Sequence, residues 1–394
     1  MKSTDIAFLM TGDLHRNIRA LKQLRSLSEH GFTVKAYHLG GSVARTVLPK
    51  GVTEEVVPVP PGRGPLYFKA LSRAFSRAIQ GSTAALYHAS DLYTLSACAA
   101  AARKNGTQYS YDSRELYAHV AATRGRPWVR WWWSRLEGKL ISGAACVFTV
   151  SDSIADRLEV TYKIERPIVV HNVPEVDPLS ETASSTADIN YVPPQTMAVL
   201  LDDRGLASNV PILVHLGQMK KDRGCENLIK AMPSVRKAHL VFLGFGPLEL
   251  KLKELVGALR LHDRVHFIAP VPPRAVHIAL TGATIGVTML EDTCLNHRFA
   301  LPNKLFDYLK AGLPVLSSNL TEVKRVVDLH ECGMVVNPAS PEDIANGINT
   351  MIDSPLLSIW AENARTASET FSWDKATQRF MLAINRVLTP SKSS

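Results

Sequence analysis

Residues 6–39 decide the fold expected for the first part of the chain. They comprise IAFLM at 6–10, IRALKQLRSLSEH at 18–30 and TVKAYHL at 33–39. The first and third segments are short apolar runs typical of buried strands. The middle segment has apolar residues at helical spacing and is followed by Gly31, a residue type favoured where helices end. A strand, a helix and a strand in this order predict a β-α-β unit of a parallel sheet.

The same rhythm continues along the chain. Further strands are predicted at 85–88, 108–111, 146–150 and 168–171, and, beyond a stretch rich in Ser, Thr, Asp and Pro, at 212–216, 239–243, 265–268, 285–288 and 315–318. The sequence therefore predicts an α/β protein with a Rossmann-like N-terminal domain (1–175), a linker region (176–209) with a short helix at 196–201, and a Rossmann-like C-terminal domain (210–370). Residues 371–394 are expected to form a C-terminal helix with a disordered tail.

Composition and charge narrow the class of protein. With 394 residues, 46% apolar and 21% charged, the chain suits two globular domains. No run approaches the ~18 apolar residues of a membrane span, and the apolar start is too short for a signal peptide. The five cysteines lack paired spacing, so we expect a reducing cytoplasm and neither a zinc site nor a disulfide framework. No cofactor is expected. The formal net charge of +9 favours anionic partners, and without a nucleic-acid motif we expect no nucleic acid among them.

The segment PNKLFDYLKAGLP, residues 302–314, has the clearest helix boundaries. Its first proline and its Gly-Leu-Pro end mark the start and stop of a short helix. Asn303, Lys304 and Asp307 then share one face. A lysine in the first turn opposes the helix dipole by about 0.3–1 kcal/mol unless an anion lies nearby, which a diphosphate would supply. The alternative is a solvated lysine on a surface helix.

Two glycine-containing loops follow predicted strands of the C-terminal domain. In LGQMKKDRG (216–224), Gly217 would allow close approach of a ligand to the backbone, and Arg223 offers a guanidinium suited to phosphate oxygens. Gly244 and Gly246 follow the next strand as a weaker G-x-G pattern. Solvated turns are the alternative for both loops.

These segments, with residues 314–318 and with NIR (17–19), HASD (88–91), YDSRE (111–115), TVS (149–151) and HNVP (171–174), resemble glycosyltransferase family 4, the group 1 glycosyltransferases. The resemblance covers nearly the whole chain. It implies the GT-B fold, in which two Rossmann-like domains face each other across a cleft and the C-terminal helix returns to the first domain.

The resemblance also implies a reaction. This would be a retaining transfer of a sugar from a nucleotide diphosphate donor to a carbohydrate or lipid-linked acceptor, in cell-envelope or exopolysaccharide synthesis. The leaving phosphate would help deprotonate the acceptor hydroxyl without a metal, and the chain has no D-x-D motif. A nucleotide-sugar 2-epimerase and a non-catalytic nucleotide-binding scaffold remain alternatives.

The same resemblance assigns roles to individual donor-site residues. Arg223 and Lys304 would neutralise the diphosphate. Asp307 would hold the ribose hydroxyls, and Gly12 would face the transferring group. The other expected donor-site residues are Gly217, Gly244, Gly246 and Asn303.

Three positions depart from the family pattern. The family has two glutamates eight positions apart, whereas this chain has Phe299 and Asp307, so the carboxylate that contacts the donor sugar is missing. Gln218 replaces the basic residue after the first glycine, and Arg114 replaces a histidine. Neutralisation of the diphosphate therefore depends more heavily on Arg223 and Lys304.

Two polar residues close a predicted strand of the N-terminal domain. His88 and Asp91 are candidates to position or polarise the acceptor hydroxyl. Alternatively, His88 is a structural hydrogen-bonding residue, and Asp91 caps the helix that begins at Leu92.

The segment RGRPWVRWWWSRLEGK, residues 124–139, predicts a helix from Pro127. Helical spacing places Trp128 and Trp132 in an apolar stripe and leaves Trp131 beside Arg135, outside it. An exposed tryptophan among arginines suits the inner face of an anionic membrane, so Trp131, Arg135, Arg114 and Glu115 are expected on the acceptor or membrane side. The alternative is that the tryptophans pack in the core and the arginines are solvated.

Overall fold

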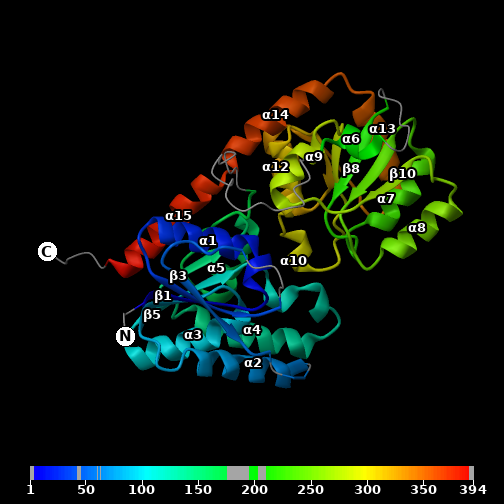
Figure 1. The fold of residues 1–394 in the computed structure, drawn as a ribbon. Coiled ribbons are helices and arrows are strands. Elements are labelled where there is room, and N and C mark those ends of the chain that lie inside the picture. Colours follow the sequence, from blue (N-terminus) through cyan, green and yellow to red (C-terminus); the bar gives the residue numbers. More distant parts are fainter. Residues whose placement is uncertain are drawn as a thin grey trace. The chain divides into compact units, whose positions relative to one another are not determined.

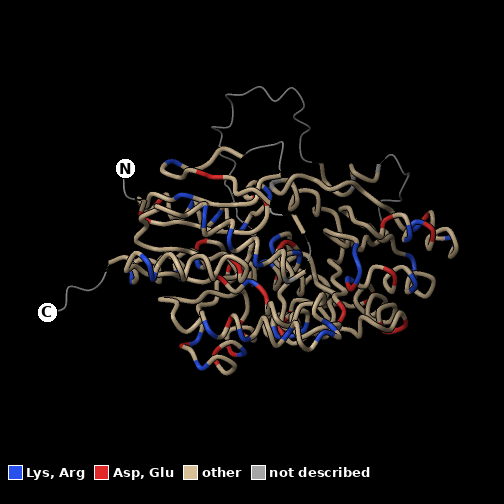
Figure 2. Tube along the Cα trace, turned by 90° about the horizontal axis from the view of Figure 1, so that it is seen from below, with Lys and Arg blue, Asp and Glu red and all other residues tan. Residues whose placement is uncertain are grey.

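The computed structural model describes residues 4–41, 46–59, 61–62, 64–174, 195–202 and 210–389. Most of the predicted linker region lies outside these residues, as do residues 390–394 of the predicted disordered tail (389–394). The chain divides into two compact units, one formed by Met1–Asn172 with Asp374–Ser394 and the other by Val173–Trp373. Lys and Arg are interspersed with Asp and Glu over both units (Figure 2).

The described residues of the first unit form a seven-stranded parallel sheet with the order β3-β2-β1-β4-β5-β6-β7. Its strands are β1 Thr4–Met10, β2 Val34–Leu39, β3 Val52–Val57, β4 Ala84–Ala89, β5 Gln108–Ser113, β6 Cys146–Thr149 and β7 Ile168–Val169. Its helices are η1 Leu14–Arg16, α1 Ile18–Glu29, α2 Gly64–Ala78, α3 Leu92–Asn105, η2 Tyr117–His119, η3 Ala121–Thr123, α4 Pro127–Ile141 and α5 Asp152–Tyr162, with the C-terminal α15 Trp373–Leu388. Helices α2, α3 and α4 cover one face, and α1, α5 and α15 cover the other (Figure 1).

The described residues of the second unit form a six-stranded parallel sheet with the order β10-β9-β8-β11-β12-β13. Its strands are β8 Ile212–Leu216, β9 His239–Leu243, β10 Val265–Ile268, β11 Ile285–Thr288, β12 Val315–Ser318 and β13 Gly333–Val336. Its helices are α6 Met197–Asp202, α7 Cys225–Ala231, η4 Met232–Ser234, α8 Glu249–Ala258, η5 Pro273–Ala275, α9 Val276–Leu280, α10 Leu295–Arg298, α11 Asn303–Lys310, α12 Thr321–His330, α13 Pro341–Ile352 and α14 Leu357–Thr370. The predicted fold class is confirmed, because each unit is a parallel α/β sheet.

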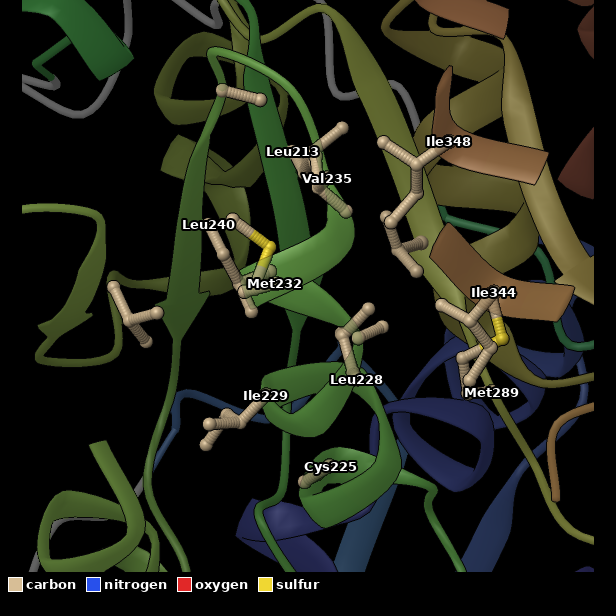
Figure 3. Packing of buried hydrophobic residues seen from close by; sticks show 14 of the residues in the cluster. Leu213, Cys225, Leu228, Ile229, Met232, Val235, Leu240, Met289, Ile344 and Ile348 are labelled. Carbon is tan, nitrogen blue, oxygen red and sulfur yellow. The ribbon is translucent and has the colours of Figure 1, made fainter. Parts of the chain in front are cut away.

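The short apolar runs of the sequence form the buried central strands of the two sheets. In the second unit, Leu213 of β8, Leu228 of α7 and Ile344 of α13 belong to one buried cluster that holds helices against the sheet (Figure 3). The edge strands β3 and β13 were not predicted. β3 has the sequence VTEEVV, with buried residues only at its two ends and polar residues between them, so a search for short apolar runs misses it.

The strand orders define where ligands are expected. In each sheet the chain first adds strands on one side of the opening strand and then continues on the other, so β1 lies between β2 and β4, and β8 lies between β9 and β11. Loops at the carboxyl ends of such strands meet at the switch point, which is the usual ligand site of open parallel sheets. A ligand is therefore expected beside the loops after β1 and β4 in the first sheet, and beside those after β8 and β11 in the second.

Candidate functional site

The loop after β8 leaves the sheet through a glycine with a left-handed backbone. Gly217 has φ 100°, and a Cβ added there would meet no atom within 4 Å. At the far end of the loop Gly224 has φ 66°, and a Cβ would lie 2.2 Å from the carbonyl oxygen of Met289. The first glycine thus presents open backbone at the switch point, and the second lets the loop pack against the chain beyond β11.

The glycines after β9 have a structural explanation. A Cβ on Gly244 would lie 2.1 Å from the carbonyl oxygen of Gly217, and one on Gly246 would lie 2.1 Å from that of Met219. The Met219 N–H also donates to the Phe245 carbonyl at 2.9 Å. Close packing of the two loops accounts for both glycines, so their contact with a donor remains a prediction.

Helix α11 brings a lysine to the end of β8. The helix begins at Asn303, which is exposed, directly after Pro302, and Lys304 in its first turn is half-buried. Lys304 Nζ lies 3.0 Å from Nε2 of His215, a residue of β8. His215 was not predicted as a site residue, because a histidine inside an apolar strand has no distinguishing local pattern.

Two cations, Lys304 and Arg223, lie close enough at this site to disfavour each other's charge. Burial is the main cause that lowers the pKa of Lys304 to about 7; Cys225 acts in the opposite direction, the Arg223 charge adds to the lowering, and Asp307 opposes it least. Arg223 is half-buried and lies close enough to influence Lys304, His215 and Cys225. Two cations that disfavour each other's charge would both be stabilised by an anion between them. The structure thus groups Arg223, Lys304 and Asp307 at the switch point of the second sheet.

The position of the missing carboxylate is occupied by a half-buried phenylalanine, Phe299, just after α10. Of the nearby carboxylates, Asp292 pairs with Arg298 at 2.8 Å on the surface. Glu291 is half-buried beside the loop after β8, where its N–H donates to the Asp222 carbonyl at 3.0 Å. Burial and the neighbouring Asp222 raise the pKa of Glu291.

In the first unit His88 lies inside the sheet. Its exposure is 1%, its ring stacks on Phe8 with centroids 4.7 Å apart, and Nδ1 lies 2.9 Å from Ser110 Oγ. Burial lowers its pKa to about 4, so the imidazole is neutral near pH 7. These contacts favour the structural role over general-base catalysis.

Asp91 joins three segments at the switch point of the first sheet. Its Oδ1 accepts the N–H of Thr94 at 3.1 Å, so it caps α3 as the alternative interpretation expected. Its Oδ2 accepts both the N–H and the hydroxyl of Thr11 at 2.7 Å and lies 3.7 Å from Arg114 Nη2. Gly12, which follows Thr11 in the chain, has φ 95°, and a Cβ added there would meet no atom within 4 Å. Gly12, Asp91 and Arg114 are therefore brought together, and Glu115 beside them is exposed.

The predicted apolar stripe of α4 is wrong. Trp128 and Trp131 are each 63% exposed and Trp132 is 38% exposed, whereas Trp133 is buried. The side of α4 that is buried carries Glu137, which is 1% exposed, together with Trp133. A prediction from the spacing of apolar residues alone places this carboxylate on the exposed side of α4. It therefore predicts the wrong buried face for the helix.

Hydroxyl groups hold the Glu137 carboxylate inside the unit. Tyr111 donates to it at 2.7 Å, Tyr162 at 2.8 Å and Ser113 at 3.3 Å. Trp131 is exposed as expected, with the Arg135 guanidinium 5.7 Å from its ring.

One group of described side chains has the composition of a metal site. His15 and His38 place their Nε2 atoms 2.9 and 3.1 Å from Glu54 Oε2. However, each Nδ1 accepts a backbone N–H, from Thr46 at 3.0 Å and from Leu14 at 3.3 Å. The proton of each neutral ring is therefore on Nε2, where a metal would need a lone pair. The arrangement fits a carboxylate that accepts two hydrogen bonds and ties the loop after β1 to β2 and β3.

Comparisons with known proteins define the class. The family model described as "Glycosyl transferases group 1" matches residues 200–367, and "Glycosyl transferase 4-like domain" matches residues 17–173. An exopolysaccharide phosphotransferase of Streptomyces coelicolor is 27% identical over 155 residues, 39% of this chain and 16% of that protein. The α-D-kanosaminyltransferase of Streptomyces kanamyceticus is 24% identical over 176 residues, 42% of this chain and 41% of that protein. The chain thus matches less than half the length of either relative.

Solved structures resemble the whole chain. Sucrose-phosphate synthase from Thermosynechococcus elongatus has a TM-score of 0.77 at 16% identity, covering 97% of this chain and 98% of that one. Anabaena HepE in complex with UDP and glucose has a TM-score of 0.71 at 15% identity, covering 97% and 99%. The protein therefore has the GT-B fold. It belongs to the group 1 glycosyltransferases, as its sequence motifs indicated.

Proposed function

We propose that this protein is a retaining glycosyltransferase that takes its sugar from a nucleotide diphosphate donor bound by the second unit. The observation that carries the proposal is the pair of cations, Arg223 and Lys304, at the switch point beside β8. Asp307, which lies close enough to influence Lys304, is proposed to hold the ribose hydroxyls. Gly217 would allow the donor to approach the backbone, because a Cβ there would meet no atom within 4 Å. HepE, which shares the fold, was solved with UDP and glucose, and this supports a nucleotide-sugar donor.

The proposed chemistry follows from these charges. As the bond between sugar and diphosphate breaks, negative charge grows on the leaving phosphate, and fixed cations stabilise that charge without a metal. The phosphate oxygen then accepts the proton of the attacking hydroxyl on the same face of the sugar. Because His88 is buried, and because burial lowers its pKa to about 4 and makes it a weak base, we assign the proton transfer to the phosphate rather than to this histidine.

The donor class is tested by thermal-shift measurements with UDP, GDP, ADP and TDP and their sugars, on wild type and on Arg223→Ala. A ligand at a hundred times its Kd should stabilise the fold by about 2.7 kcal/mol. We expect one base series to raise the Tm of wild type and the rise to be lost in Arg223→Ala. If none of these nucleotides raises the Tm, the proposed donor site is wrong and a non-catalytic scaffold is favoured.

The proposed acceptor is a carbohydrate or lipid-linked sugar of the cell envelope or an exopolysaccharide, bound by the first unit, with the protein peripheral on the inner face of the membrane. None of the helices that the structure describes has the length and apolar composition needed to span a bilayer. The exposed Trp128, Trp131 and Trp132 on α4, with Arg135 beside Trp131, suit a surface of anionic lipid.

The membrane proposal predicts a result with vesicles. The double variant Trp128→Ala/Trp131→Ala should co-sediment much less than wild type with vesicles that contain phosphatidylglycerol, and raising the salt concentration should release wild type. Leu250→Ala, which removes a side chain exposed to 76% on the second unit, is the matched control. Equal sedimentation of wild type and the tryptophan variant would refute membrane docking by α4.

Family membership favours transfer over the epimerase alternative. With no acceptor present, an epimerase would convert the sugar of the nucleotide sugar into its epimer. A transferase would leave the configuration of that sugar unchanged. Product analysis of the donor incubated alone separates the two.

A further inference from the structure

His215 lies behind the lysine of the proposed donor site and has no part in the proposed chemistry. It is on β8 with an exposure of 1%. Its Nε2 lies 3.0 Å from Lys304 Nζ and 3.6 Å from Cys225 Sγ. It is therefore fixed by the sheet, and it can orient the lysine before any ligand arrives.

The His215 imidazole can orient Lys304 through a hydrogen bond without adding a charge to the site. Burial and the charges of Lys304 and Arg223 hold the pKa of His215 well below its ordinary value, so it is neutral. A neutral Nε2 facing an ammonium can only accept a hydrogen bond. A carboxylate in this place would instead cancel the charge of Lys304 and compete with a phosphate.

The other groups that face Lys304 supply little compensation. Cys225 of α7 would favour the ammonium only as a thiolate, and burial raises the pKa of this thiol to about 11, so it is neutral near pH 7. Arg223, from the loop after β8, disfavours the ammonium, and Asp307 of α11 favours it only as the smallest influence. Lys304 is thus positioned as a donor while its protonated form is destabilised.

We propose that His215 is a positioning residue that presents Lys304 without a counter-charge, so that binding of a nucleotide diphosphate above neutral pH draws one proton from solvent onto Lys304 Nζ. This inference rests on the proposed function and adds how the affinity of the donor site for the nucleotide diphosphate depends on pH. The proton is the only species exchanged, and no covalent bond other than N–H changes.

The direction of the pH dependence follows from linkage. Free Lys304 has a pKa of about 7, and an adjacent diphosphate raises it. Between these two values the complex holds more protons than the free protein, so affinity falls about tenfold per pH unit as pH rises above about 7. Below this range Lys304 is protonated in both states and takes up no proton. His297, which is half-buried and influenced by Arg223, also has a lowered pKa, so its own uptake would be confined to lower pH.

Isothermal titration calorimetry tests this inference directly. UDP, or whichever of GDP, ADP and TDP binds instead, is titrated at pH 6.0 and 8.5 in pairs of buffers with different ionisation enthalpies. At pH 8.5 the terminal phosphate of the nucleotide is fully ionised, since its second pKa is about 6. We expect wild type to take up about one proton per nucleotide at pH 8.5, because Lys304 with a pKa of about 7 is mostly uncharged there.

Substitutions at the same position separate positioning from packing. His215→Glu should abolish the uptake at pH 8.5 and lower affinity at least about tenfold, because its carboxylate keeps Lys304 protonated and competes with the phosphates. His215→Gln, a neutral acceptor, should keep the uptake. His239→Gln, at the opposite end of the neighbouring strand, is the matched histidine control.

The calorimetric results for wild type and the His215 variants distinguish failure of this inference from failure of the proposed donor site. Binding to wild type without proton uptake at pH 8.5 overturns the inference and leaves the donor site standing. Unchanged uptake in a folded His215→Glu also overturns it. If none of the four nucleotides binds, the proposed function and the inference fail together. If His215→Glu does not fold, wild type and His215→Gln still give the answer.

Discussion

Lys304→Met should lower kcat/KM about 10²–10³-fold, the typical effect of removing one preorganised group that stabilises charge in a transition state. The ammonium lies at the switch point of the second sheet, and Gln218 cannot replace the missing charge. Nucleotide release from the donor named by the thermal-shift screen is the measurement. Because burial disfavours the charged lysine, the Tm of the ligand-free variant should not fall.

The control for this experiment is Lys310→Met, at the other end of α11. It removes the same charge from the same helix and should leave turnover close to wild type. If both variants lose activity equally, Lys304 does not act at the diphosphate. If Lys304→Met lowers the Tm and activity together, its role is structural.

Arg19→Met should destabilise the first unit by about 3–5 kcal/mol, because it leaves a buried carboxylate without its counter-charge. Arg19 binds Asp112 through Nε at 2.8 Å and Nη2 at 2.9 Å, and the two side chains are 3% and 0% exposed. Arg19 Nη1 also donates to the Val170 carbonyl at 2.6 Å, so one guanidinium ties α1 to β5 and to the chain after β7. Burial alone would raise the pKa of Asp112, but Arg19 lowers it below the ordinary value.

Urea unfolding followed by tryptophan fluorescence measures this loss, since four of the six tryptophans lie on α4 of the first unit. Arg19→Met/Asp112→Leu should recover much of the stability, because an apolar pair leaves no buried charge. Arg166→Met, whose partners Asp152 and Asp156 form a surface cluster, should cost less than about 1 kcal/mol. Equal losses in Arg19→Met and Arg166→Met would show that burial of the first pair adds nothing.

The parts of the candidate site that could be predicted are those set by neighbouring residues in the chain, such as helix boundaries and loops after strands. Pro302 and Gly312 set the boundaries of α11 and hence the face that Lys304 occupies, and the loop after β8 placed Arg223. His215 could not be predicted, because its contact with Lys304 joins residues 89 positions apart. The burial of His88 likewise depends on Phe8 and Phe380, which come from distant segments.

For the fold as a whole, the sequence by itself determined two parallel α/β sheets, because alternating short apolar runs and helical periodicity are properties of neighbouring residues. It also determined the family, through motifs in a fixed order. Only the tertiary structure decided the edge strand β3, the buried face of α4 that carries Glu137 and the packing of Gly244 against Gly217. Each depends on partners distant in the chain, and a hydrogen bond to a buried carboxylate or a contact between two backbones leaves no local periodicity.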